Sequence, residues 1–190
     1  MLAGDLRGRG IDLVTTFQPG GTPLGRRLRE SFLETEEVVA PIAELLLFAA
    51  DRAQHVELLI KPALAEGRLV ISDRYADATR AYQGAGRGFS EDIIERVISL
   101  ATSGLEPDLT LFFDLPVENA LGRMSARSES GEKTNRMDFE TVEFYERVRA
   151  KYLDLAADQP DVFRIISANK PLEEIHKNVL ETVTRFLELA

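Results

Sequence analysis

A short apolar run, Leu69 to Ile71, constrains the fold most strongly because it lies between Gly67 and the charged pair Asp73 and Arg74. Such a run is typical of a strand buried on both faces, as in parallel sheets covered by helices. Ligands of open α/β sheets bind beyond the carboxyl ends of the strands, so we expect Asp73 and Arg74 at the mouth of a crevice. There an Asp can hold hydrated Mg²⁺, and an Arg can bind a phosphate with its fork of donors.

Tyr82 and Gln83 follow in the same stretch and supply a flat ring and an amide that can both donate and accept hydrogen bonds. Together with a phosphate-binding arginine, they favour a site for a nucleoside monophosphate. The alternative is an Asp-Arg pair that caps a helix and a tyrosine in the core. For residues 73–75 taken alone, we favour that alternative.

Composition narrows the function further. A chain of 190 residues is long enough for one domain with a substantial core, and its net charge of −9 argues against nucleic acid or an anionic membrane as partner. The absence of cysteine excludes disulfides and thiolate metal sites and is compatible with a reducing cytosol. No apolar stretch is long enough to span a bilayer and no signal peptide opens the chain, so we expect a cytoplasmic protein. His55 and His176 lie far apart and are expected at the surface or in packing roles.

Strand and helix patterns alternate along the chain, which indicates an α/β fold. Strands are expected at 11–16, 69–71, 109–113 and 162–167, and helices at 2–9, 24–33, 40–65 with breaks at Pro41 and Pro62, 90–103, from about 116 to 127, 139–157 and 171–189. Phe48 and Arg52 are four apart and therefore share one helical face. Taken alone, Phe48 is more typical of a core residue and Arg52 of a solvated charge. Asp114 ends the third strand as either a helix cap or a ligand.

Three arginines bracket a polar segment in the second half of the chain. Arg123 and Arg127 close a helix, residues 128–135 have the composition of a mobile flap, and Arg136 lies at its far end. This pattern suits a lid, around 123–137, that brings positive charge to phosphates. The alternative is a solvated surface loop.

Several segments match the order and spacing of one family. They are Phe48-Ala-Ala-Asp-Arg52, Asp73-Arg-Tyr75, Ala81-Tyr-Gln-Gly84, Pro19-Gly-Gly-Thr22 and Pro107-Asp-Leu-Thr110, with the arginine-flanked lid. The chain resembles a bacterial thymidylate kinase from residue 1 to residue 190. The resemblance implies a single domain with a three-layer fold, a parallel sheet flanked by helices, of the P-loop NTPase type. It also implies a homodimer.

In the family, ATP phosphorylates dTMP to dTDP with Mg²⁺ on the phosphates, in dTTP biosynthesis. By resemblance, the thymine contacts are stacking on Phe48 and hydrogen bonds from Arg52, Thr79 and Gln83, while Tyr82 crowds the position of a ribose 2′-hydroxyl. Arg74 would hold the dTMP phosphate, Asp73 would serve Mg²⁺ and its waters, Arg127 and Arg136 would neutralise the transferred group, and Arg123 would contact ATP.

The sequence departs from the family on the ATP side. The family opens with a strand and a loop of the form Gly-x-x-x-x-Gly-Lys-Ser/Thr that cradles the ATP phosphates, and these 190 residues contain no such segment. We expect that the first strand and this loop are missing, through truncation or a late gene start, and that the strand belongs between 69–71 and 109–113. Phe17-Gln18 replaces the usual Arg-Glu, a loss that Arg26, Arg27 or Arg29 could offset. The alternatives are a catalytically inactive dTMP-binding relative and a kinase for another nucleoside monophosphate.

Overall fold

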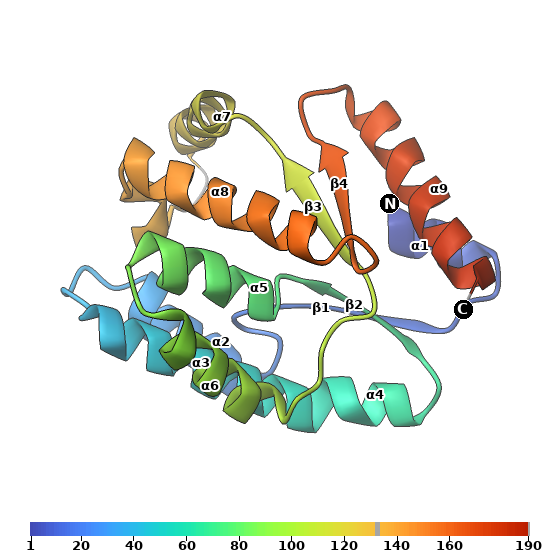
Figure 1. Ribbon diagram of the computed structural model, residues 1–190, viewed down its shortest axis with the longest axis horizontal. Coiled ribbons are helices and arrows are strands. Elements are labelled where there is room, and N and C mark those ends of the chain that lie inside the picture. The colour runs from blue at the N-terminus through green and yellow to red at the C-terminus, as the bar shows by residue number, and fades with distance from the viewer. Residues whose placement is uncertain (132–133, 190) are drawn as a thin grey trace.

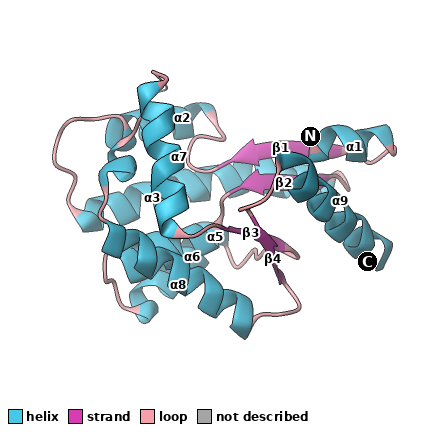
Figure 2. Ribbon diagram, turned by 90° about the horizontal axis from the view of Figure 1, so that it is seen from above, coloured by secondary structure: helices cyan, strands magenta, loops and turns pink. Residues whose placement is uncertain are grey.

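The computed structural model describes residues 1–131 and 134–189 as an α/β fold in which helices surround short parallel strands (Figures 1 and 2). The strands are β1 (Leu13–Phe17), β2 (Leu69–Asp73), β3 (Thr110–Asp114) and β4 (Phe163–Ser167). The α-helices are α1 (Leu2–Gly8), α2 (Pro23–Leu33), α3 (Pro41–His55), α4 (Lys61–Ala65), α5 (Ala76–Thr79), α6 (Glu91–Thr102), α7 (Val117–Glu129), α8 (Val142–Asp158) and α9 (Leu172–Leu189). Two π-helical segments, η1 (Val56–Ile60) and η2 (Arg80–Gly86), and a 3₁₀ turn, η3 (Arg136–Phe139), complete the described elements.

The strands form two parallel pairs. β1 pairs with β2 from Leu13↔Leu69 to Phe17↔Asp73, and β3 pairs with β4 from Thr110↔Phe163 to Asp114↔Ser167. All four predicted strands are therefore confirmed, with small shifts at their ends. Parallel pairing places Phe17 and Asp73 at the same edge, where the turn after β1 meets the segment after β2.

Within the described residues, β2 and β3 share no backbone ladder, so the strands form two sheets rather than one. A common core holds the two sheets together. Leu13 from β1 and Ile166 from β4 belong to one buried cluster, which also contains Leu6 of α1 and Val179 and Val183 of α9. Figure 1 shows α1 and α9 side by side next to this part of the sheets.

The region from 41 to 65 stays helical throughout, because α3, the π-helical segment η1 and α4 follow one another without a gap. Pro41 is its first residue, where a missing N–H costs nothing, and the π-helical segment η1 precedes Pro62 near the start of α4. A π-helical turn changes the hydrogen-bond spacing, which accommodates a proline without ending the helix. The interruption predicted at Pro62 therefore takes the form of a π-helical segment just before this proline, and the chain stays helical through it.

Helices α5 and η2, which follow β2 directly, were not predicted from the sequence. Gly84 and Gly86 lie inside η2 and lower its helical propensity. At Gly86, an added Cβ would lie 2.5 Å from the Phe144 ring, so the glycine permits α8 to pack closely against η2. Tertiary contact therefore stabilises this helical segment where local propensity does not.

Candidate active site

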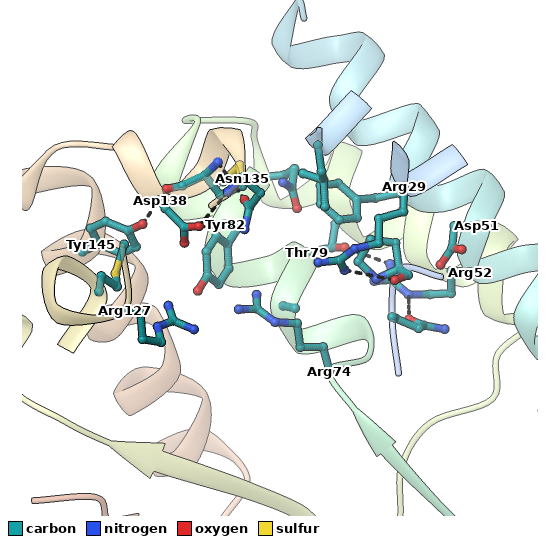
Figure 3. A pocket seen from close by; sticks show the side chains of 18 residues that line it. Arg29, Asp51, Arg52, Arg74, Thr79, Tyr82, Arg127, Asn135, Asp138 and Tyr145 are labelled. Carbon is teal, nitrogen blue, oxygen red and sulfur yellow. Dashed lines mark hydrogen bonds between the residues drawn. The ribbon is translucent and has the colours of Figure 1, made fainter. Parts of the chain in front are cut away.

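A cavity of about 190 Å³ lies between the turn after β1, helix α3, the segment after β2 and the region around η3 (Figure 3). A cavity of about 150 Å³ holds benzene, so this one has room for a pyrimidine ring. Its lining includes seven residues predicted from the sequence, which are Phe48, Arg52, Arg74, Thr79, Tyr82, Gln83 and Arg127. The fold therefore gathers them from α3, α5, η2, α7 and the end of β2.

Arginines outnumber carboxylates in this lining. Arg29, Arg52, Arg74 and Arg127 border the cavity, together with the two acidic residues Asp51 and Asp138. Because the whole chain carries a net charge of −9, this positive cluster is a local exception. It favours an anionic ligand that a few placed guanidinium groups can bind.

Asp51 on α3 fixes the turn that borders the cavity. Its Oδ1 accepts a hydrogen bond from the Gly20 amide at 2.9 Å, and the residue is buried. Burial raises the pKa of the Asp51 carboxyl, although the hydrogen bond from Gly20 opposes that rise. A Cβ at Gly25 would lie 2.2 Å from the same Oδ1, so only glycine lets α2 approach α3 this closely.

Arg52 is held by three acceptors, one from the turn after β1 and two from the segment after β2. Its Nε donates to Gln18 Oε1 at 3.0 Å, and its two terminal nitrogens donate to Thr79 Oγ1 at 2.8 Å and Tyr75 O at 3.0 Å. Burial lowers the pKa of Arg52 to about 10, which still leaves the guanidinium charged at neutral pH. An arginine has five N–H donors, so two remain available to a ligand in the cavity.

His55 supports Arg52 through Gln18, which contacts both side chains. Gln18 uses its Oε1 to accept from Arg52, and its Nε2 lies 2.8 Å from His55 Nδ1. His55 Nε2 lies 2.6 Å from Thr16 Oγ1. Because the Gln18 amide nitrogen can only donate, His55 Nδ1 accepts and Nε2 carries the proton. Burial and the charge of Arg52 lower the pKa of His55 to about 4, so the ring is neutral at physiological pH.

Two further arginines, Arg74 and Arg127, also border the cavity. Arg74 has a φ of 69°, an unusual backbone conformation for a non-glycine residue, and its guanidinium carbon lies 4.9 Å from the Tyr82 ring centroid. Figure 3 shows Arg74 and Arg127 pointing toward each other beside Tyr82. Among the described residues, neither guanidinium is paired with a carboxylate. Arg29 lies nearby and donates to Pro19 O at 3.2 Å.

Comparisons with known proteins identify the family. A family model described as "Thymidylate kinase" matches residues 1–179. The chain is 45% identical over 190 residues to a thymidylate kinase of Pseudomonas fluorescens, covering 100% of this chain and 89% of the relative. It is 42% identical over 186 residues to one of Trichlorobacter lovleyi, covering 96% and 88%. The chain belongs to the thymidylate kinase family. The crystal structure of a thymidylate kinase from Ehrlichia chaffeensis has the same fold, with a TM-score of 0.76, 27% identity and coverage of 96% and 87%.

Three residues assigned by resemblance to the thymidylate kinase family do not line the cavity. Asp73 is exposed at the end of β2, and Arg123 donates to Ala168 O at 3.0 Å. Arg136 donates to the Glu44 carboxylate at 2.5 Å and to Phe32 O at 3.3 Å. The predicted lid differs in part, because α7 continues to Glu129 and η3 begins at Arg136. Glu132 and Lys133, within the lid, lie outside the described residues.

Asp114 does not cap the helix that follows it, and its role as a ligand stays a prediction. Its carboxylate accepts two hydrogen bonds from Arg149 of α8, at 2.6 and 3.0 Å, and no side chain caps α7.

Sequence reasoning also missed two supporting residues of this thymidylate kinase fold, Glu44 and Gln18. Arg29, one of three candidates for a compensating charge, is the one that borders the cavity. Among the described residues, no helix is long and apolar enough to cross a membrane.

Proposed function

We propose that this chain binds dTMP in the cavity and catalyses transfer of the γ-phosphoryl group of ATP to it, giving dTDP. The observation that carries the proposal is that one cavity holds the aromatic ring of Phe48, the buried guanidinium of Arg52 and the cationic pair Arg74 and Arg127. A planar base and a phosphate, separated by a sugar, match this arrangement.

The base lies on Phe48, whose ring is held by an edge contact with Phe32 at 4.8 Å between centroids. One of the two N–H donors of Arg52 that remain available donates to a carbonyl oxygen of thymine. Thr79 and Gln83, both almost fully buried, offer further hydrogen bonds to the base. Tyr82 lies between this end and the cations, where it crowds the position that a ribose 2′-hydroxyl would occupy.

The phosphate of dTMP lies between Arg74, Arg127 and Arg29. Phosphoryl transfer needs mainly positioning of the reactants and stabilisation of charge on the transferred group. Arg74 and Arg127 supply that charge, and no carboxylate in the described part of the chain pairs with either of them. Arg136 serves the same group in this proposal, once it leaves Glu44.

Asp73 is the candidate for the metal. Mg²⁺ in phosphoryl-transfer sites keeps several waters and uses one or two carboxylates besides the phosphates, so a single exposed carboxylate at the end of β2 fits it. The described residues contain no group of three or more potential metal ligands. When bound, Mg²⁺ neutralises charge on the phosphates.

We also propose that the chain is a homodimer of the cytoplasm. Helices α3 and α6 pack against each other, and both carry exposed apolar side chains, namely Ile42, Leu46, Ile93 and Leu100. Exposed apolar surface of this kind is typical of protein–protein contacts. Measurement of the molar mass by light scattering tests the dimer, and Leu46→Glu should shift the species towards a monomer.

Calorimetric binding of dTMP and thymidine tests the substrate. Arg74→Gln should weaken dTMP binding by about tenfold or more while leaving thymidine binding nearly unchanged, because the lost group contacts only the phosphate. Arg96→Gln, which changes an exposed arginine paired with Asp92 on α6, is the matched control. Absence of dTMP binding by the unmodified chain would refute the proposal.

ATP-dependent formation of dTDP separates the candidate functions. Binding of dTMP without dTDP formation under any Mg-ATP concentration favours an inactive nucleotide-binding relative. Equal binding of another nucleoside monophosphate favours a kinase of different base specificity.

A further inference from the structure

Glu44 is a buried carboxylate outside the proposed nucleotide contacts. It lies on α3, one turn before Phe48, and its side chain is 0% exposed. Four hydrogen bonds reach its two oxygens. Gln83 Nε2 donates to Oε1 at 2.8 Å, Arg87 donates to Oε1 at 3.1 Å and to Oε2 at 3.0 Å, and Arg136 donates to Oε2 at 2.5 Å. Because it accepts so many hydrogen bonds, this buried carboxylate is held in one position.

The carboxylate determines which way the Gln83 amide faces. An ionised carboxylate has acceptors only, so it pairs with the NH₂ end of the amide and never with the carbonyl end. Among the described residues, no donor reaches the carbonyl oxygen of Gln83, at the other end of the amide. Since the described residues contain no buried side-chain oxygen without a partner, this atom is accessible from the cavity that Gln83 lines.

Glu44 keeps its charge despite its burial. Burial alone would favour the neutral acid, but the hydrogen bonds from Arg87, Gln83 and Arg136 outweigh it and lower the pKa of the Glu44 carboxyl. Arg87 is itself shared with Glu140 at 2.5 Å. Arg87, which lowers this pKa more than Arg136 does, therefore holds the carboxylate in the one protonation state that fixes Gln83, also when Arg136 leaves Glu44.

The cavity thus presents a donor and an acceptor together, from Arg52 and from Gln83. The thymine edge carries the complementary pair, a carbonyl oxygen at position 4 and an N–H at position 3. Cytosine carries the reverse pair, an amino group and an unprotonated ring nitrogen. A site with one fixed acceptor rejects the base that lacks the matching donor, because a buried polar group is then left unpaired.

We infer that Glu44 is a positioning residue that sets base selectivity, by holding the Gln83 amide with its carbonyl oxygen toward the N3–H of thymine. This inference rests on the proposed function. An amide at position 44 could pair with either end of Gln83, which would let Gln83 present a donor as readily as an acceptor. Glu44→Gln should therefore lose discrimination between dTMP and dCMP.

The experiment measures dissociation constants of dTMP and dCMP by calorimetry, for the 190-residue chain and its variants. The ratio of the two constants should fall about tenfold in Glu44→Gln. Glu140→Gln, which also removes a carboxylate from Arg87 but does not touch Gln83, should keep the ratio. In a Gln83→Leu background, Glu44→Gln should have no further effect on selectivity.

Three outcomes would overturn the inference. One is a folded Glu44→Gln variant with the ratio of the unmodified chain, and another is an equal loss in Glu140→Gln. The third is an unchanged ratio in Gln83→Leu, which decides the matter even if Glu44→Gln does not fold. If the unmodified chain binds neither nucleotide, it is the proposed function that fails instead.

Discussion

Lowering the pH from 7 to 5 should remove the part of the stability of this protein that depends on a neutral His55. The imidazole is fully buried, and both ring nitrogens are engaged, Nδ1 by Gln18 and Nε2 by Thr16. A proton on Nδ1 would face the NH₂ group of Gln18, which has no acceptor to offer at that end. Charging the ring therefore requires the Gln18 amide to turn over and release Arg52.

The magnitude follows from the two pKa values of the imidazole. Burial lowers the pKa of His55 from 6.5 to about 4, so the unfolded chain binds a proton in this range and the folded chain does not. Above pH 6.5, His55 does not change the stability of the fold. The destabilisation it causes grows as the pH falls from 6.5 to about 4, and it is constant below that. Each pH unit in this window removes about 1.4 kcal/mol of stability, so the loss at pH 5 is about 2 kcal/mol.

Urea unfolding at pH 7 and pH 5 measures this loss. Carboxylates also titrate in the window, so the quantity of interest is the difference between variants. The unmodified chain should lose about 2 kcal/mol more than His55→Gln, and His176→Gln, which removes the only other histidine, is the control. The His176→Gln variant also leaves a single imidazole for titration by NMR. A pKa near 6.5 in that titration, or equal losses in all three proteins, would refute the argument.

Two further predictions concern stability and are measured by urea unfolding. Gly25→Ala should lower the free energy of unfolding by about 1–3 kcal/mol, because the added Cβ would lie 2.2 Å from Asp51 Oδ1. Gly122→Ala is the control inside α7, where an added Cβ would meet no atom within 4 Å, and it should stabilise the protein by up to about 1 kcal/mol. Equal effects of the two substitutions would contradict the predicted clash. Arg80→Met should cost about 3–5 kcal/mol, because it removes a 2.9 Å ion pair from the buried carboxylate of Asp77. A loss below about 1 kcal/mol would show that the carboxylate finds another partner.

The strands were predictable because their signals are local. The clearest are β2 and β3, which are apolar runs that end in an aspartate. The helix after β2 was not predictable in this way, since two glycines interrupt its pattern and its stabilising partner, Phe144, lies far along the chain. Local propensity carries no information about such a contact.

The cavity residues were predictable only as a set. Phe48, Arg52 and Arg74 each have a commoner structural role, and it was their order and spacing that indicated a nucleotide site. The partner of Arg136 was beyond sequence reasoning, because Glu44 is 92 residues away and nothing local indicates that their side chains meet. The same holds for Gln18, 34 residues from Arg52.

Helix α3 explains why the supporting residues were missed. Glu44, Asp51, Arg52 and His55 recur at helical spacing, and a polar stripe of this kind is normally the solvated face of an amphipathic helix. Here the stripe is between 0% and 2% exposed, while Ile42 and Leu46 of the same helix are 50% and 54% exposed. Burying the charged face and exposing the apolar face adds little to the stability of a single chain, because burying charges costs more free energy than burying leucines. The arrangement is accounted for if the polar face builds the nucleotide site and the apolar face is covered by a second copy of the chain, so loss of the dimer in Leu46→Glu should also weaken dTMP binding through α3.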